Sequence, residues 1–297
     1  MPIAPLVIVN PTAGGGRASR SVAWLSERLV DWPNAKLEVT RRRGDAEALA
    51  ADAIRLGHDR VIAVGGDGTV QEIVNGLLAP SDPAELGILP VGSGNDLARS
   101  LQVPRHRVDA WMTAIGDRTR QIDAALATNG REQSRWFVSA GGIGFDAQVA
   151  AAMERRSRWQ TGRTGYLLTT LRELLRFTNR SVTLTIDGVT TSEDVLLIAI
   201  ANGAYYGGGM RIAPAAAVDD GLLDLCIVGN LSRVAAVGQL ANLYRGTHVG
   251  HPSVSIRSGS EIVIEGDAHT RTHLDGEPFG TLPLRVSVRR GALRVAG

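Results

Sequence analysis

The sequence predicts an α/β nucleotide-binding domain of the doubly wound, Rossmann-like kind, followed by an antiparallel β-sandwich domain. Two observations carry this prediction. In residues 1–123, short apolar, β-branched runs alternate with glycine-rich turns and with segments of helical periodicity. From residue 124 onward, runs of strand character are separated by turn residues. We therefore expect one domain over residues 1–123 and a β-rich domain over residues 124–284.

The first elements are two strand–helix units. The predicted strands cover residues 6–9 and 37–40, and the predicted helices cover residues 18–29 and 46–56. A glycine turn, Asn10-Pro11-Thr12-Ala13-Gly14-Gly15-Gly16, follows the first strand, and Thr40 ends the second. The carboxyl ends of parallel strands meet at one edge of such a sheet, where ligands bind. Thr40 is therefore either a site residue or an ordinary strand-end threonine.

The most informative stretch is residues 61–78. A buried strand, residues 61–64, leads into Gly65-Gly66-Asp67-Gly68-Thr69 and then into a helix whose apolar side chains lie on one face. Glycines allow a close backbone approach, and the unpaired N–H groups of a helix N-terminus attract anions. A phosphate site is the prediction, and a tight turn without a ligand is the alternative. No Gly-Lys-Ser/Thr motif is present, so backbone N–H groups, arginines and a metal ion would have to hold the phosphate.

A third glycine turn, residues 91–96, follows a strand over residues 86–90 and opens another helix. Ser93 and Asn95 can donate hydrogen bonds to phosphate or ribose. Asp96 can cap the helix, hold a metal-bound water, or do both. Asp67 and Asp96 together could hold water around Mg²⁺, which keeps several waters by preference. A helix over residues 108–115 then leads into residues 119–123.

The second domain is predicted to consist mostly of strands. These strands are expected over residues 136–140, 182–186, 195–201, 222–228, 260–265 and 284–288, with a glycine turn at 141–146, a helical stretch over 147–177 and a hairpin turn at Asp187-Gly188. Asp275-Gly276-Glu277 is predicted on a turn between residues 270–274 and Pro278-Phe279. Two carboxylates on one turn can face one cleft, where one can act as a general base. The alternative is a hairpin with solvated acids.

Composition excludes several classes of protein. The 297 residues are 44% apolar and carry a net charge of only +2, so nothing in the charge requires nucleic acid. The longest apolar run, residues 195–201, is far shorter than the roughly 20 residues of a membrane-spanning helix. The N-terminus also lacks the basic segment of a signal peptide, and we expect a soluble, cytoplasmic protein. Cys226 is the single cysteine, which excludes a disulfide framework and predicts an inert core residue.

Two weaker features have ordinary explanations. The histidine pairs His248/His251 and His269/His273 have no further ligands close in sequence, so core or surface histidines are favoured over a zinc site. The basic segment 154–163, which contains Trp159, is either a solvated helix face or a segment that rests on an anionic membrane surface.

Five motifs, taken together, point to a family. They are Asn10-Pro11…Gly14-Gly15-Gly16, Gly65-Gly66-Asp67-Gly68-Thr69, Gly92-Ser93-Gly94-Asn95-Asp96, Asp219-Asp220-Gly221-Leu222-Leu223-Asp224 and Asp275-Gly276-Glu277. In this order and spacing the chain resembles, over essentially its full length, the bacterial soluble diacylglycerol-kinase-like lipid kinases, which share a catalytic fold with sphingosine kinases. NAD kinases and phosphofructokinases carry turns similar to the second motif, so the whole set is specific and that motif alone is not.

The resemblance implies a set of site residues. The implied ATP contacts are Asn10, Pro11, Thr12, Ala13, Gly14, Thr40, Gly66, Asp67, Gly68, Thr69, Val70, Gln71, Glu72 and Ser93. Many relatives have threonine where Ser93 stands, and the hydroxyl is kept. Glu277 is implied as the general base, with Asp275 orienting the acceptor or holding a metal. A second Mg²⁺ site is implied at the Ala217 carbonyl, the Asp220 carboxylate and the Leu222 carbonyl.

The resemblance also implies the architecture and the reaction. ATP and an acceptor lipid would meet in a cleft between the two domains, and the strands near residues 285–297 would return to the first domain. We expect an ATP- and Mg²⁺-dependent kinase that phosphorylates a lipid alcohol, most simply diacylglycerol, and that visits the membrane surface transiently. A kinase of a soluble acceptor, similar to NAD kinase, and a non-catalytic nucleotide-binding module are the alternatives. The oligomeric state is not encoded in any motif, and a homodimer is compatible with the sequence.

Overall fold

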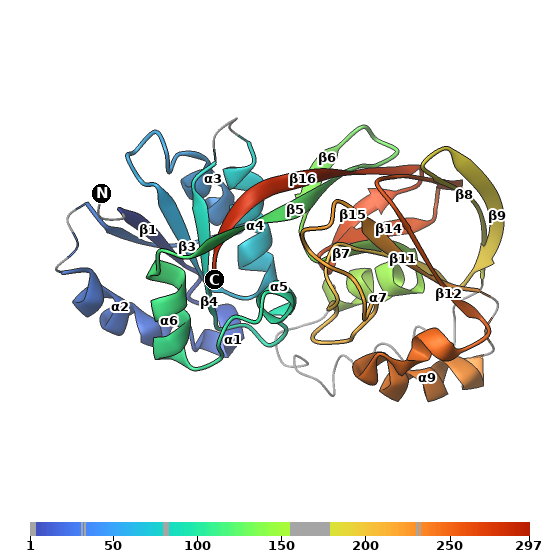
Figure 1. The fold of residues 1–297 in the computed structure, drawn as a ribbon, viewed down its shortest axis with the longest axis horizontal. Helices are drawn as coiled ribbons and strands as arrows, with labels where there is room; N and C mark the ends of the chain where they lie inside the picture. Colours follow the sequence, from blue (N-terminus) through green and yellow to red (C-terminus); the bar gives the residue numbers. More distant parts are fainter. Residues whose placement is uncertain are drawn as a thin grey trace. The chain divides into compact units, whose positions relative to one another are not determined.

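The computed structural model describes residues 4–30, 32, 34–79, 83–154, 179–229, 231 and 233–297. The contacts within the chain divide it into two compact units (Figure 1). Unit 1 comprises residues 1–124 and 290–297, and unit 2 comprises residues 125–289. Two long strands, β5 (Thr119–Thr128) and β16 (Leu284–Ala296), run from one unit into the other.

Unit 1 is built on a parallel sheet. Its strands are β1 (Pro5–Val9), β2 (Lys36–Val39), β3 (Arg60–Gly65) and β4 (Glu85–Pro90), in the order β2-β1-β3-β4. Near the end of β16, Val295 pairs in parallel with Leu86 of β4. The strands β1 and β3 are buried along their whole length, as their continuous apolar sequences predict. The predicted α/β fold with a parallel sheet is confirmed.

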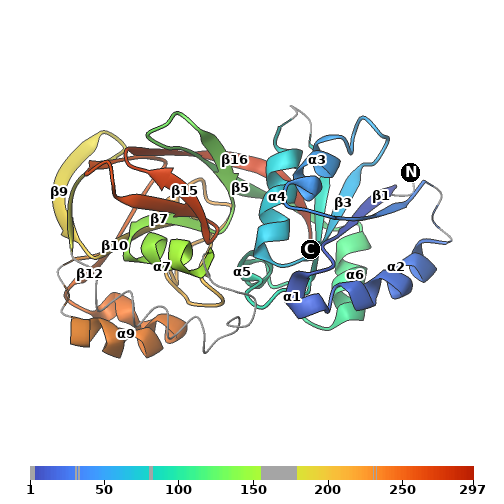
Figure 2. The ribbon, with the colours of Figure 1, turned by 180° about the vertical axis from the view of Figure 1, so that it is seen from behind.

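Helices cover both faces of this sheet (Figures 1 and 2). They are α1 (Ala13–Gly16), α2 (Val22–Leu29), α3 (Asp45–Ala51), α4 (Asp67–Leu77), α5 (Asp96–Ser100) and α6 (Arg107–Ile115), with a 3₁₀ turn, η1 (Ser19–Ser21). The helices α3 and α4 pack together on one face. On the other face, α2 and α6 meet through an edge-to-face contact of Trp24 and Trp111, with ring centroids 6.0 Å apart. The predicted helix over residues 18–29 is wrong in its first part, where η1 precedes α2.

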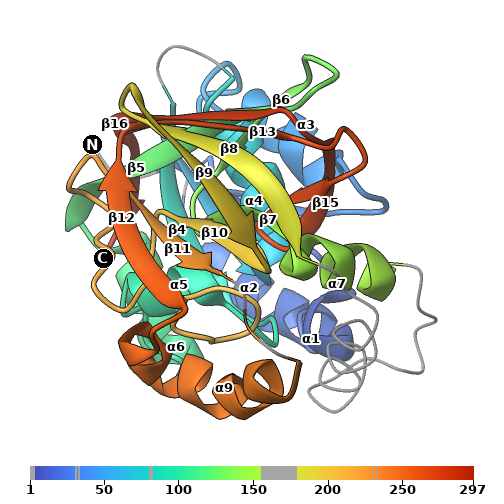
Figure 3. The same ribbon diagram turned by 90° about the vertical axis from the view of Figure 1, so that its right-hand side faces the viewer.

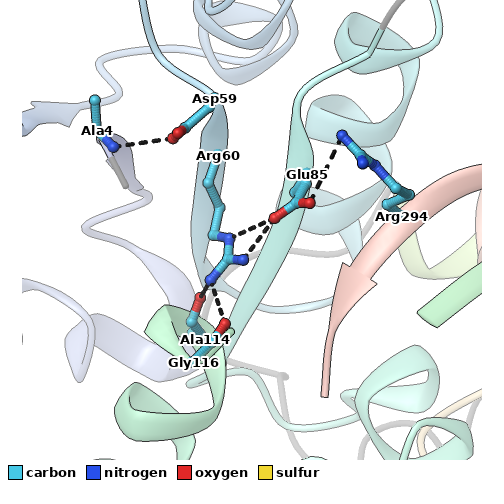
Figure 4. A network of polar contacts seen from close by, with 7 residues as sticks. All are labelled: Ala4, Asp59, Arg60, Glu85, Ala114, Gly116 and Arg294. Atoms are coloured by element: carbon cyan, nitrogen blue, oxygen red, sulfur yellow. Dashed lines mark hydrogen bonds and ion pairs between the residues drawn. The ribbon is translucent and has the colours of Figure 1, made fainter. Parts of the chain in front are cut away.

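A buried ion pair joins the amino ends of β3 and β4 (Figure 4). The side chain of Arg60 is 2% exposed, and its guanidinium donates to the Glu85 carboxylate over 2.5 and 3.1 Å. The same guanidinium donates to the carbonyls of Ala114 and Gly116, and Arg294 lies 3.6 Å from Glu85. The glycine turns follow the carboxyl ends of these strands, so this network lies at the opposite edge of the sheet and acts on stability.

Replacing Glu85 with alanine is expected to destabilise unit 1 by about 3 kcal/mol, because it leaves the buried Arg60 cation without its carboxylate. Chemical denaturation of the full chain measures the loss. Glu38→Ala is the matched control: its pair with Lys36, at 2.7 Å, is exposed, and its removal is expected to cost less than about 1 kcal/mol. Equal losses in the two variants would contradict a special role for the buried pair.

Unit 2 consists mainly of two antiparallel sheets (Figure 3). One runs in the order β12-β11-β10-β7-β14-β15, with the strands β7 (Ala140–Gly144), β10 (Leu197–Ala201), β11 (Leu223–Val228), β12 (Val254–Gly259), β14 (Arg271–Leu274) and β15 (Glu277–Thr281). The other contains β8 (Arg180–Ile186), β9 (Val189–Val195), β13 (Glu261–Gly266) and the first part of β16, and β5 also pairs with β6 (Ser134–Phe137).

One apolar core draws on both of these sheets, and it includes Phe137, Ile143, Leu184, Ile198 and Ile262. The predicted antiparallel sandwich is therefore confirmed. The described residues of this unit also form the helices α7 (Phe145–Glu154) and α9 (Arg233–Arg245) and a 3₁₀ turn, η3 (Thr247–Gly250). In its described residues the chain has no helix that is long and apolar enough to cross a membrane.

Several predicted elements of unit 2 are corrected. The predicted strand over residues 136–140 is two strands, β6 and β7, and Gly141–Gly144, predicted as part of a turn, lies inside β7. The helix α9 and the strand β12 were not predicted, because the apolar residues of α9 do not follow a single helical stripe. The hairpin turn at Asp187-Gly188 is confirmed, with left-handed φ values of 46° and 84°. The basic segment that was noted beyond Glu154, residues 155–163, lies outside the described residues, as does the rest of the predicted helix to residue 177.

Candidate functional site

The structure brings the three glycine turns of unit 1 together. They follow β1, β3 and β4, and backbone hydrogen bonds connect them to neighbouring strands. The N–H of Asn10 donates to the Val64 carbonyl at 3.1 Å, and the N–H groups of Val91 and Gly92 donate to the Gly65 carbonyl at 2.8 and 3.1 Å. The carboxyl edge of the sheet therefore presents the three turns as one backbone surface.

The glycines are needed first for the contact between the turns. A Cβ atom on Gly92 would lie 2.5 Å from Gly66 Cα, and one on Gly14 would lie 2.2 Å from the Val91 carbonyl oxygen. A Cβ atom on Gly65 would lie 2.4 Å from Thr69 Oγ1. The glycines were predicted to allow the close approach of a ligand, and these distances show that they also allow the turns to approach one another.

Asp67 ties the second turn to the third. It is the first residue of α4, and its carboxylate accepts the backbone N–H groups of Asn95 at 2.8 Å and Asp96 at 2.5 Å. Burial raises the pKa of Asp67, and these two hydrogen bonds act in the opposite direction. Each carboxylate oxygen keeps a further lone pair, so contact with a metal-bound water remains compatible with this clamping role.

Asn10 ties the first turn to the second in a similar way. Its side-chain amide donates to Thr69 Oγ1 at 3.0 Å, and its Oδ1 atom accepts the N–H and the hydroxyl of Thr12 at 3.1 and 2.8 Å. Arg17, which the sequence analysis did not single out, donates from its guanidinium to the carbonyls of Gly14 and Val91 at 2.9 and 3.3 Å. The position of Arg17 directly after the glycines could have identified it as a site residue. Its guanidinium places a cation at this edge of the sheet.

The remaining predicted nucleotide contacts differ in accessibility. The side chains of Thr69, Val70 and Gln71 are buried in α4. The Val70 N–H already donates to the Gly66 carbonyl at 3.0 Å, and Gln71 lies beyond the first helical turn, so of these three residues only Thr69 can offer its backbone N–H to a ligand. Thr40 is also buried at the end of β2, and both its N–H and its hydroxyl donate to the Val9 carbonyl. Ser93, in contrast, is exposed. The turns therefore offer mainly backbone donors, as a phosphate site without a lysine requires.

The predicted turn of unit 2 is a two-residue hairpin between β14 and β15. Asp275 and Gly276 have φ values of 47° and 84°, and Leu274 pairs with Glu277. The Asp275 carboxylate accepts the backbone N–H groups of Val138, Ser139 and Ala140 at 3.2, 3.0 and 3.0 Å. These bonds hold the break between β6 and β7, and Asp275 therefore acts as a structural anchor.

Glu277 differs from Asp275 in its surroundings. It is the first residue of β15, its side chain is 26% exposed, and its carboxylate lies 3.4 Å from the guanidinium of Arg135. A partly exposed carboxylate is accessible to an approaching hydroxyl and can accept its proton. Of the two acids of this hairpin, Glu277 has the surroundings of a general base.

A buried polar pair near this hairpin was not predicted. His273 Nε2 lies 2.9 Å from Asp146 Oδ2, with side chains 3% and 8% exposed, and the Tyr206 ring stacks near His273. A Cβ atom on Gly142 would lie 2.7 Å from Asp146 Oδ2, so the glycine of β7 makes room for the pair. His273 is the core histidine that was favoured over a zinc ligand, and its partner Asp146 had no sequence signal.

The remaining candidates for a metal or a reactive group behave as ordinary residues. His248 is buried beside Cys226, burial lowers the pKa of His248, and burial together with the Asp146 charge raises the pKa of Cys226 to about 12. Cys226 is a buried core residue, as the sequence predicts. In the part of the chain that the structure describes, no three histidine, cysteine or acidic side chains form a group that could hold a metal ion.

The predicted second Mg²⁺ site lies on the turn before β11. Gly221 has a φ of 79°, and the exposed Asp220 accepts the N–H of Leu222 at 3.0 Å. The three predicted ligands, the Asp220 carboxylate and the carbonyls of Ala217 and Leu222, all come from this short segment. A site there would depend on one carboxylate and two carbonyls, and it stays a prediction.

A parallel α/β unit with phosphate-type glycine turns, joined to an antiparallel sandwich with an acidic hairpin, defines the class of NAD-kinase-like and diacylglycerol-kinase-like phosphotransferases. Comparisons with known proteins agree. Residues 4–127 match the diacylglycerol kinase catalytic domain, and residues 138–297 match the YegS C-terminal NAD kinase beta sandwich-like domain. The chain belongs to the family of diacylglycerol-kinase-like lipid kinases, and it is a kinase by that membership.

Individual relatives cover nearly the whole chain. A diacylglycerol kinase of Mycobacterium tuberculosis is 32% identical over 297 residues, which cover 97% of this chain and 93% of the relative. A Pseudomonas fluorescens protein named "Probable lipid kinase YegS-like" is 33% identical over 271 residues, covering 91% and 87%. A crystal structure described as "a putative diacylglycerol kinase from Bacillus anthracis str. Sterne" has a TM-score of 0.81 at 25% identity, covering 100% of this chain and 96% of that chain.

Proposed function

We propose that the protein transfers the γ-phosphoryl group of ATP to the hydroxyl of a lipid alcohol in a Mg²⁺-dependent reaction, and that the acceptor is diacylglycerol. The observation that carries the proposal is the set of three glycine turns clamped together by Asp67 and Asn10 at the carboxyl edge of the parallel sheet. The names of the M. tuberculosis and P. fluorescens relatives support a lipid acceptor, and diacylglycerol is the acceptor that the first of them names.

The residues of unit 1 would hold the nucleotide. Backbone N–H groups at the start of α4, around Gly68 and Thr69, face the carboxyl edge and would bind phosphate oxygens. Arg17 would neutralise part of the phosphate charge, and Ser93 would donate its hydroxyl. These contacts position the γ-phosphoryl group for in-line transfer, which is most of what catalysis of this reaction requires.

The residues near Asp67 fit a hydrated magnesium ion. Asp67 and Asp96 supply carboxylate oxygens, and Asn95 Oδ1 is buried without a hydrogen-bond partner in the described residues. Oxygen donors of this kind are those that Mg²⁺ prefers. When bound, the ion would neutralise charge on the phosphate oxygens. The turn at Ala217, Asp220 and Leu222 is proposed as a separate, structural Mg²⁺ site.

Glu277 would accept the proton of the acceptor hydroxyl. The hydroxyl oxygen then forms the new bond to the γ-phosphorus, the bond from that phosphorus to the bridging oxygen breaks, and ADP leaves with the electron pair. The product of a diacylglycerol acceptor is phosphatidic acid. Asp275 would keep Glu277 in place by anchoring the hairpin, and we propose that the protein works at the membrane surface without spanning it.

Transfer of labelled γ-phosphate tests the proposal. Purified protein is given ATP and either Mg²⁺ or a chelator, with mixed micelles of diacylglycerol, monoacylglycerol, ceramide, sphingosine or polyprenol, and with NAD in a micelle-free reaction. The expected result is an organic-soluble labelled product from diacylglycerol that requires Mg²⁺ and disappears in Glu277→Gln. Label on NAD alone would assign the protein to the soluble-acceptor kinases. ATP binding without any product would favour a non-catalytic nucleotide-binding module.

A further inference from the structure

Unit 2 contains a small basic pocket that none of the predicted sites includes. It is lined by Gly144, Gln148, Arg180, His269, Thr270 and Arg271. The lining residues come from the end of β7, from α7, from the start of β8 and from the start of β14. We call it the β7–β14 pocket.

The charge of the β7–β14 pocket is positive. Arg180 and Arg271 line it together with His269, and no carboxylate is among the lining residues. Arg180 lies 3.5 Å from Asp267, which is outside the lining, and this exposed pair leaves most of the guanidinium's donors available. Two arginines around one small concavity suit a phosphate group, since a guanidinium binds its oxygens in bidentate fashion.

Thr270 supplies an independent observation. Its residue is 3% exposed, and its hydroxyl oxygen has no hydrogen-bond partner in the described part of the chain. Its backbone N–H is already used, since it donates to the Asp267 carbonyl at 2.8 Å. A buried hydroxyl without a partner is costly unless a ligand completes its hydrogen bonds. Thr270 lines the pocket with its hydroxyl oxygen buried behind the wall, and a rotation about its Cα–Cβ bond would let the hydroxyl donate to an anion there.

The β7–β14 pocket is distinct from the acidic hairpin. Thr270 and Asp275 flank the four residues of β14, so five steps of roughly 3.3 Å along the strand separate them by about 17 Å. The neighbouring strand agrees, because Gly144 at one end of β7 lines the pocket and Ala140 at the other end bonds to Asp275. A phosphate in the pocket would therefore not occupy the position of the acceptor hydroxyl at Glu277.

We propose that the β7–β14 pocket binds a phosphate group, either the headgroup phosphate of an anionic lipid or a free phosphate ion. Arg180 and Arg271 would provide the charge, and the Thr270 hydroxyl would donate to a phosphate oxygen. A lipid headgroup in the pocket would hold unit 2 on an anionic membrane surface. This binding does not depend on the phosphoryl transfer proposed above.

Binding of the full-length protein, without ATP, tests the inference. The probes are inorganic phosphate, measured by calorimetry, and phosphatidylcholine vesicles with and without phosphatidylglycerol, measured by co-sedimentation. The double variant Arg180→Gln/Arg271→Gln is compared with Arg285→Gln/Arg289→Gln, which removes the same charge from exposed positions of β16 in the same unit. The pocket variant is expected to bind its probe about 25-fold more weakly, at about fivefold per arginine, and the control within about twofold of the wild type.

Thr270→Val and Thr270→Ser separate a site from diffuse charge attraction. Valine has the shape of threonine without its hydroxyl and is expected to weaken binding about tenfold, whereas serine keeps the hydroxyl and is expected to restore it. Loss of phosphate binding identifies a free-ion site, and loss confined to phosphatidylglycerol vesicles identifies a lipid headgroup site. Equal losses in the two arginine pairs, no effect of Thr270→Val, or no binding of either probe would overturn the proposal.

Discussion

Replacing Asp67 with asparagine is expected to lower kcat/KM for ATP by about 100-fold, although the two side chains have nearly the same shape. The carboxylate accepts two backbone N–H groups, those of Asn95 and Asp96, with different oxygens. An asparagine has one acceptor oxygen, and its amide group would face the second backbone N–H as another donor. The third glycine turn would then move, and a displacement of about 1 Å at a phosphate site costs roughly this factor.

The measurements are steady-state kinetics, ATP binding and thermal unfolding of the same protein. Asp187→Asn is the matched control, because its carboxylate clamps the backbone N–H groups of Ser260 and Glu261 at 3.0 and 2.8 Å in unit 2. Both variants are expected to lose some stability, since hydrogen bonds to a charged group contribute about 1.5–3 kcal/mol. Only Asp67→Asn is expected to lose ATP binding. Normal turnover of Asp67→Asn would contradict the assignment of the phosphate site.

The parallel sheet and its glycine turns could be predicted because their signals are local. An apolar run, several glycines and a helical stripe within residues 61–78 determine a strand, a turn and a helix without help from the rest of the chain. The break between β6 and β7 could not be predicted, because it depends on Asp275, which is 135 or more residues away from its partners. The glycines of β7 favoured a turn locally, and tertiary hydrogen bonds and the room needed by Asp146 and His273 favoured a strand.

The two buried polar pairs could not be predicted for the same reason. Arg60 and Glu85 are 25 residues apart, and Asp146 and His273 are 127 apart, so only strand pairing brings each pair together. The residue pattern alone left Asp275 and Glu277 as two acids on one turn, and the family resemblance favoured Glu277 as the base. The structure separates them: one carboxylate is used by three backbone N–H groups, and the other is partly exposed beside Arg135.

This difference predicts opposite behaviour for the two acids. Glu277→Gln is expected to reduce kcat by a factor on the order of 100 to 10,000 if Glu277 is the base, because the amide cannot accept a proton. It should leave thermal stability nearly unchanged, since the lost ion pair with Arg135 is partly exposed. Glu132→Gln, which removes a similar but exposed pair with Arg285, is the control and is expected to keep full activity.

Asp275→Asn is expected to reduce the stability of the fold more than it reduces activity. Its carboxylate stabilises three backbone N–H groups at the start of β7, and an amide can satisfy only part of them, so a loss of about 3 kcal/mol in the free energy of unfolding is expected. At a temperature where the variant is folded, its kcat should fall less than that of Glu277→Gln. The opposite ranking, with Glu277→Gln active and Asp275→Asn stable but inactive, would transfer the role of base to Asp275. Denaturation curves and kcat measured on the same preparations decide between the two assignments.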